Sequence, residues 1–154
     1  MASEIIKLLE TRGVTVEDIV EIVYTLQKPY HPDLEREPCV VSVMRVLAKR
    51  EVQYALYTGI ALDVLAEQKQ LPDPLQSIME TDEPLYGVDE ILALGITNVY
   101  GSIGLTSFGY LDKEKMGIIA KLNNKRNGIH VFLDDLVAGV AAAASARIAH
   151  RAKS

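Results

Sequence analysis

Two adjacent carboxylates, Asp134 and Asp135, precede an alanine-rich stretch in the segment HVFLDDLVAGVAAAASARIAH. One interpretation is helix capping, because acids at a helix N-terminus accept hydrogen bonds from unpaired backbone N–H groups and favour the helix dipole. The other is a metal site, since the small residues that follow would let a second helix bring its own carboxylates close. This segment alone leaves both interpretations open.

A second acidic pair, Asp89-Glu90, begins another apolar helical segment. Glu90, Ala93, Thr97 and Asn98 recur at three- to four-residue spacing, which predicts a polar stripe along one side of the helix. Such a stripe needs a buried polar partner or a metal ion. The alternative is that Asp89 caps the helix while Thr97 and Asn98 face solvent. Four acids on two helix starts would suit Mg²⁺, which prefers oxygen ligands.

Two further segments could contact phosphate. In YLDKEK, we expect Asp112 to cap a helix whose first turn carries Lys113 and Lys115. Lysines oppose the dipole there, so a phosphate contact is one explanation; a solvated turn is the other, and we favour it for Lys115. The run GSIG, which contains Ser102, could cradle a phosphate with its backbone N–H groups or could be a helix C-cap.

The elements that must position these residues are helical almost throughout. Apolar residues recur at helical spacing and only IHVF alternates, so we predict an all-α fold, a compact multi-helix single domain over residues 1–154. The main local signals are a stop at Gly13, a capping pattern at Thr15 and Asp18, a first-turn proline at Pro38, a long helix from about Glu51 to Lys69, and a short helix opened by Asp73-Pro74.

Composition limits the classes of partner and location. A hydrophobic content of 49% supports a substantial core, and a net charge of −5 argues against a nucleic-acid partner. The single cysteine, Cys39, excludes an internal disulfide and fits a reduced, cytoplasmic location. The N-terminus shows no signal-peptide pattern. The longest apolar run, Leu136 to Ala146, falls well short of the ~20 residues that cross a bilayer. We therefore expect no membrane span, with peripheral membrane contact left open.

Three motifs within residues 86–139 resemble the phosphatidylglycerophosphatase A family. GVDEILALG is similar to the family's Asp-Glu motif, FGYLDKEKMG to its phenylalanine–aspartate–lysine segment, and FLDDLVAG to its Asp-Asp-x-x-Ala-Gly signature. The last match is the most specific. The whole chain is most similar to the soluble Gram-positive branch, which includes low-temperature-requirement proteins.

The resemblance implies a Mg²⁺-dependent phosphatase that removes the terminal phosphate of phosphatidylglycerophosphate, with Mn²⁺ or Ca²⁺ as substitute ions. It implies metal ligation by Asp89, Glu90, Asp134 and Asp135. Asp112 would be a ligand or the catalytic acid/base and Lys113 a phosphate contact. We also predict that Asp134 is catalytic and that Asn98 and Ser102 contact the substrate.

We therefore expect an all-helical phosphohydrolase acting on a phosphorylated small molecule or lipid, through either a water or an aspartate nucleophile. Two rivals remain: a non-catalytic protein that binds a metal or phosphorylated ligand in cold or stress adaptation, and a structural helical oligomer whose acids are caps. We also expect a homo-oligomer, because the aliphatic residues Val40, Val41, Ile60 and Val64 and the alanine-rich final helix could pack between subunits.

Overall fold

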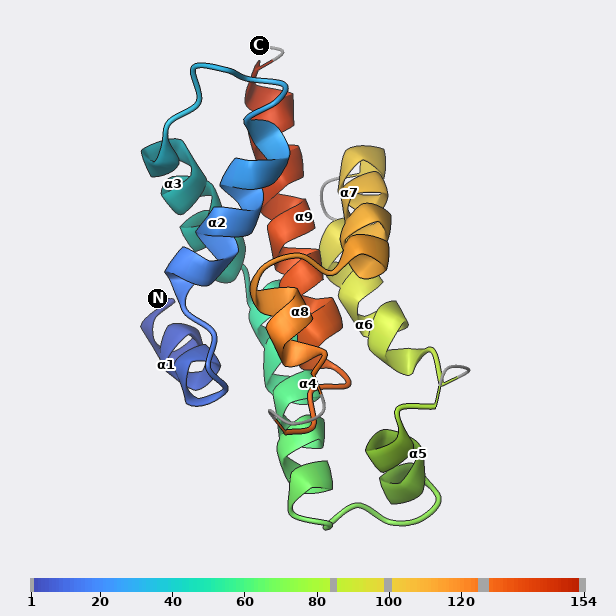
Figure 1. Cartoon of the computed structure of the whole chain (residues 1–154). Coiled ribbons are helices and arrows are strands. Elements are labelled where there is room, and N and C mark those ends of the chain that lie inside the picture. The colour runs from blue at the N-terminus through green and yellow to red at the C-terminus, as the bar shows by residue number, and fades with distance from the viewer. Residues whose placement is uncertain (1, 84–85, 99–100, 125–127, 153–154) are drawn as a thin grey trace.

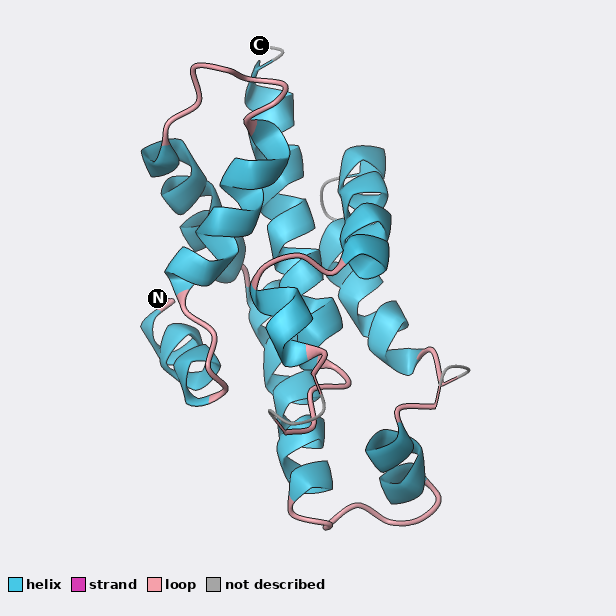
Figure 2. Cartoon of the chain, in the orientation of Figure 1, coloured by secondary structure: helices cyan, strands magenta, loops and turns pink. Residues whose placement is uncertain are grey.

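The computed structural model describes residues 2–83, 86–98, 101–124 and 128–152, apart from the side chains of 101–106 and 151–152. Within these ranges the chain forms helices and no strand, which confirms the predicted all-α fold (Figures 1 and 2). The helices are α1 (Ser3–Thr11), α2 (Val16–Gln27), α3 (Arg36–Leu47), α4 (Arg50–Glu67), α5 (Leu75–Thr81), α6 (Val88–Thr97), α7 (Gly101–Glu114), α8 (Ile118–Leu122) and α9 (Leu133–Ala152).

The final helix, α9, is the centre of the molecule. It lies between the α2–α3 side and the α6–α7 side in Figure 1, and it also packs against α4 and α8. Every residue from His130 to Ala146 is buried. The alanines allow these neighbours to approach closely because each side chain is a single methyl group. The expectation that they pack against a second subunit is therefore wrong: the methyl groups are covered by the chain's own helices.

Most local signals in the sequence form the structures predicted for them. The side chain of Thr15 accepts a hydrogen bond from the backbone of Asp18, and the Asp18 side chain accepts one from the backbone of Thr15, so both halves of a capping box are present. Pro38 lies in the first turn of α3, where its missing N–H costs no helical bond. The long helix predicted from about Glu51 to Lys69 is α4.

Two segments differ from the prediction. GSIG forms the start of α7 rather than a loop or a C-cap, and Asp112 lies near the C-terminal end of that helix rather than at its start. Lys113 is consequently in the last turn, where a cation favours the helix dipole. The prediction is wrong because apolar spacing continues through GSIGLTSFGYL, so glycine does not mark a boundary.

The proposed subunit-contact residues are used within the chain to different degrees. Ile60 is buried in the core, and Val40 and Val64 are half-buried and pack against it, so these three do not form an unpaired surface. Cys39 is fully buried and its thiol donates to the carbonyl of Glu35, as expected of a core residue. The oligomeric state stays a prediction. None of the described helices is long and apolar enough to span a bilayer.

Candidate metal and phosphate site

The start of α9 is capped from a distant helix rather than by its own acids. Asp63, on α4, accepts the backbone N–H groups of Phe132 and Leu133, each at 3.0 Å. Within the acidic pair, Oδ1 of Asp134 accepts the N–H of Asp135 at 2.8 Å. Since Asp63 already satisfies the first N–H groups of the helix, capping explains at most one member of the pair.

A close crossing of α6 and α9 brings the two acidic motifs together. A Cβ added at Gly139 would lie 3.1 Å from the carbonyl oxygen of Ala93, so the glycine lets the two backbones approach. One turn earlier on each helix are Asp135 and Asp89. Their carboxyl groups share a hydrogen bond, and Asp135 also shares one with Asp112 of α7. Three helices thus contribute carboxylates to one site.

Lys115, directly after α7, supplies the positive charge of this cluster. Its Nζ lies 3.3 Å from Oδ1 of Asp112 and 3.7 Å from Oδ2 of Asp134. The residue has a positive φ of 45°, which turns the chain away from the helix at this point. The side chain is 28% exposed, so it is partly accessible from outside the cluster.

Burial and crowding disturb the protonation of these groups. Asp134 and Asp135 are only 7% and 4% exposed, and burial is the main cause that raises the pKa of each. Asp134 and Asp89 raise the pKa of Asp135 further, whereas Lys115 opposes the rise at Asp134. Although its own burial acts the other way, Asp134 and Asp112 raise the pKa of Lys115. The cluster therefore has excess negative charge and favours a bound cation or retained protons.

Sequence comparison shows to which protein family the chain belongs. The family model described as Phosphatidylglycerophosphatase A matches residues 5–150. The chain belongs to the phosphatidylglycerophosphatase A family. At the level of that family it is a phosphatase, and a phospholipid-type substrate is suggested.

Close relatives share both sequence and fold. The uncharacterized protein YutG of Bacillus subtilis (strain 168) is 61% identical over 94% of this chain and 88% of its own length. The low temperature requirement C protein of Listeria monocytogenes superposes with a TM-score of 0.96 at 55% identity, over 99% of this chain and 97% of that one. A protein of unknown function from Bacillus stearothermophilus gives 0.95 at 58% identity, over 99% and 95%.

The other predicted site residues lie at the rim or away from the cluster. Glu90 is exposed; partial burial, Asp112 and Asp89 together raise its pKa, which places it near the carboxylates. Lys113 and Asn98 are exposed, and the side chain of Ser102 lies outside the described residues. The predicted polar stripe on α6 is wrong, because Thr97 is buried and bonds the carbonyl of Leu94 while Glu90 and Asn98 face outward.

Two residues of the site are not predicted by the sequence analysis. The solvated turn expected at Lys115 is wrong, because its ammonium group pairs with two aspartates. Asp63 is not among the predicted site residues, although it is fully buried. A signal does exist for Asp63: it is an acid on the apolar side of a long helix, four residues after Gly59 and three after the buried Ile60. Burial of a charge in that position requires a hydrogen-bonding partner.

The donor set has the chemistry of a hard-cation site. Asp89, Asp112, Asp134 and Asp135 offer only oxygen, which Mg²⁺ prefers to nitrogen or sulfur. Among the described residues, no three Asp, Glu, His or Cys side chains are already arranged so that they could hold a metal ion. Because metal ligands must be deprotonated, a bound ion would take the place of protons retained by Asp134 and Asp135.

Proposed function

We propose that this chain is a Mg²⁺-dependent phosphatase that hydrolyses a phosphomonoester, with phosphatidylglycerophosphate as the substrate suggested by its family. The observation that supports the proposal is the convergence of Asp89, Asp112 and Asp135 from α6, α7 and α9 beside the ammonium group of Lys115. Caps would point toward their own helix ends. Asp89 and Asp112 lie within hydrogen-bonding reach of Asp135, whereas the start of α9 is capped by Asp63.

The residues proposed to hold Mg²⁺ are Asp89, Asp134 and Asp135, with Glu90 at the rim as a further ligand. When bound, the ion would neutralise charge that develops on the transferring phosphoryl group. Mn²⁺ or Ca²⁺ would occupy the same oxygen donors, with catalysis sensitive to the difference in ion size.

The chain's own residues would bind the phosphate and move the proton. Lys115 would contact a phosphate oxygen, since it is the cation of the cluster and is partly exposed; this replaces Lys113 in that role. Asp112, whose side chain is 34% exposed, would accept the proton of the attacking water at a carboxylate oxygen. Asp134, held by Lys115 and by the N–H of Asp135, would orient the site or act as nucleophile.

A panel of phosphomonoesters tests the proposal directly. The purified chain would be assayed with phosphatidylglycerophosphate in micelles, with water-soluble phosphomonoesters, and with Mg²⁺, Mn²⁺ or EDTA. We expect phosphate release that requires the divalent ion and stops with EDTA. Mg²⁺ binding without release from any substrate would instead favour the non-catalytic, ligand-binding alternative.

Exchange of Lys115 for methionine is expected to raise KM for the phosphorylated substrate by about tenfold to 100-fold, because one charge-assisted hydrogen bond is worth ~1.5–3 kcal/mol. The arginine variant should recover part of the loss. Lys113→Met is the matched control, since Lys113 is exposed and lies two residues away. Initial rates over a range of substrate concentrations give KM for each variant. If Lys113→Met shows the larger KM, the phosphate contact belongs to Lys113 after all.

A further inference from the structure

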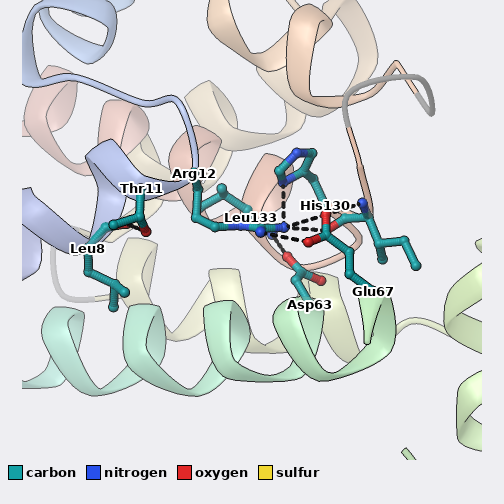
Figure 3. Close-up of polar contacts among 8 residues, drawn as sticks. Leu8, Thr11, Arg12, Asp63, Glu67, His130 and Leu133 are labelled. Atoms are coloured by element: carbon teal, nitrogen blue, oxygen red, sulfur yellow. Dashed lines mark hydrogen bonds and ion pairs between the residues drawn. The ribbon is translucent and has the colours of Figure 1, made fainter. Parts of the chain in front are cut away.

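Three residues at four-residue intervals on α4, Gly59, Asp63 and Glu67, face the start of α9. Such spacing places them along one side of the helix. At Gly59 a Cβ would overlap the side chain of Leu136 and lie 2.9 Å from Cβ of Phe132, so α4 and α9 are in close contact there. Figure 3 shows Asp63 and Glu67 both directed from α4 toward the segment that leads into α9.

Asp63 makes the central attachment. Its Oδ1 accepts the N–H of Phe132 and its Oδ2 accepts the N–H of Leu133, so both carboxylate oxygens are fixed on consecutive backbone groups. The side chain is completely buried. Two bonds from one rigid carboxylate define both the position and the direction of the first turn, and the next two residues are Asp134 and Asp135.

Glu67 makes a second attachment one turn further along α4. It accepts the N–H of Ile129 at 2.8 Å and a bidentate pair of bonds from Arg12, at 2.8 and 2.9 Å. Arg12 in turn donates to the carbonyl of Ile129 at 3.0 Å and lies 3.4 Å from Nδ1 of His130. Arg12, which comes from the end of α1, therefore fixes the segment before α9 to α4 (Figure 3).

We propose that Asp63 is a positioning residue of the catalytic site: it holds the first turn of α9 so that Asp134 and Asp135 meet Asp89 and Lys115, and the Arg12–Glu67 pair supports the same segment. This inference rests on the proposed function for its consequence in catalysis. Its structural part, the placement of the acidic pair, stands on the hydrogen bonds of Asp63. Replacement of residues that orient metal ligands commonly costs 10–100-fold in metal affinity or activity.

The variant Asp63→Asn keeps the size of the side chain but turns one acceptor into a donor that faces a backbone N–H. We expect amide hydrogen exchange at residues 132–135 to become at least tenfold faster while residues 140–144 keep their rate. We expect Mg²⁺ affinity, measured by calorimetry, to fall at least tenfold.

Ser42→Ala is the matched control. Its hydroxyl is fully buried and donates to the carbonyl of Ala144 at 2.8 Å, so the variant also removes a bond from another helix to α9, far from the acids. It should lower the melting temperature and leave Mg²⁺ affinity within twofold of the unmodified chain. A loss of affinity equal to that of Asp63→Asn would show a general stability effect and overturn the inference.

The remaining outcomes separate the inference from the proposed function. Unchanged exchange at residues 132–135, or unchanged Mg²⁺ affinity in folded Asp63→Asn, would overturn the positioning role. If the unmodified chain binds no Mg²⁺, the proposed function fails, and the exchange rates alone decide whether Asp63 positions the pair. If Asp63→Asn does not fold, Glu67→Gln replaces it: faster exchange at residues 129–135 supports the inference, and unchanged exchange overturns it.

Discussion

Replacing Asp135 by asparagine is expected to lower Mg²⁺ affinity more than tenfold and kcat about 100-fold or more, with the helical fold intact. Asp135 is the carboxyl group that connects the three helices, because it shares hydrogen bonds with both Asp89 and Asp112. Its loss would remove an oxygen donor that is only 4% exposed, and where water is excluded each electrostatic contact to the transition state counts for several kcal/mol. Calorimetry with Mg²⁺ and steady-state rates measure the two effects.

The same variant should not destabilise the metal-free chain. Asparagine has nearly the volume of aspartate and removes one of several buried like charges, so its melting temperature in EDTA should match or exceed that of the unmodified chain at pH 8. Asp33→Asn, in the exposed connector between α2 and α3, is the control and should change neither activity nor ion affinity. Full activity in Asp135→Asn would exclude the acidic pair from the site.

The all-helical fold could be predicted because the signals that specify each helix lie within that helix or next to it in the sequence. Helical spacing of apolar residues, the capping box at Thr15 and Asp18, and the proline in the first turn of α3 all act within a few residues. What could not be predicted was which helix lies at the centre of the molecule. The alanines of α9 fit a subunit interface as well as a core, and only the packing of the other helices around α9 decides for the core.

The acidic residues of the site could be predicted from the sequence, but the residues that pair with them or hold them in place could not. Asp89, Asp134 and Asp135 are recognisable because they form dense, unusual motifs. The role of Lys115 depends on where α7 ends, and helix ends are the least certain part of any assignment from sequence. Asp63 could not be connected to the site because its partners, Phe132 and Leu133, are 69 and 70 residues away along the chain.

The Asp-Asp-x-x-Ala-Gly motif has a physical explanation in this fold. Gly139 permits close contact between α9 and the backbone of α6 at Ala93. Asp135 lies one turn before Gly139 on α9, Asp89 lies one turn before Ala93 on α6, and the two carboxyl groups are close to each other. The acidic and the small residues of the motif therefore act together: the glycine sets the distance between the two helices, and this short distance brings the aspartates close to each other. A bulkier residue at position 139 would separate the carboxyl groups even though neither was changed.

Without a divalent ion, the stability of the chain is expected to fall as pH rises from 5 to 8. Burial raises the pKa of Asp134, Asp135 and Asp63, the last to about 7, above the ~3.9 of an unfolded aspartate. The folded chain therefore keeps protons that the unfolded chain has lost, and stability decreases with pH throughout this window. One retained proton corresponds to ~1.4 kcal/mol per pH unit, so the proton that Asp63 retains from pH 5 to about 7 alone corresponds to a loss of roughly 3 kcal/mol.

The two ion-paired residues Glu67 and Lys115 change charge outside this window. The Arg12 hydrogen bond lowers the pKa of Glu67, so its contribution is complete above pH ~4.5. The pKa of Lys115 is raised, and its contribution is lost only above pH ~10. Asp89 and Asp112 face Asp135 from α6 and α7. Partial burial and these two aspartates raise the pKa of Glu90, so its charge acts in the same direction as that of the pair.

Mg²⁺ should reverse this loss because it takes the place of the retained protons. Its binding requires deprotonated carboxylates, so affinity increases with pH, and an ion at 100 times its Kd adds ~2.7 kcal/mol of stability. For a chain of this size, that corresponds to a rise in melting temperature of roughly 5–10 °C at pH 8 and clearly less at pH 5.5. Thermal melts at both pH values, with EDTA or with Mg²⁺, measure the effect. Asp135→Asn should flatten the pH dependence and remove most of the Mg²⁺ shift; the same Mg²⁺ shift at both pH values would show that the buried aspartates are not where the ion binds.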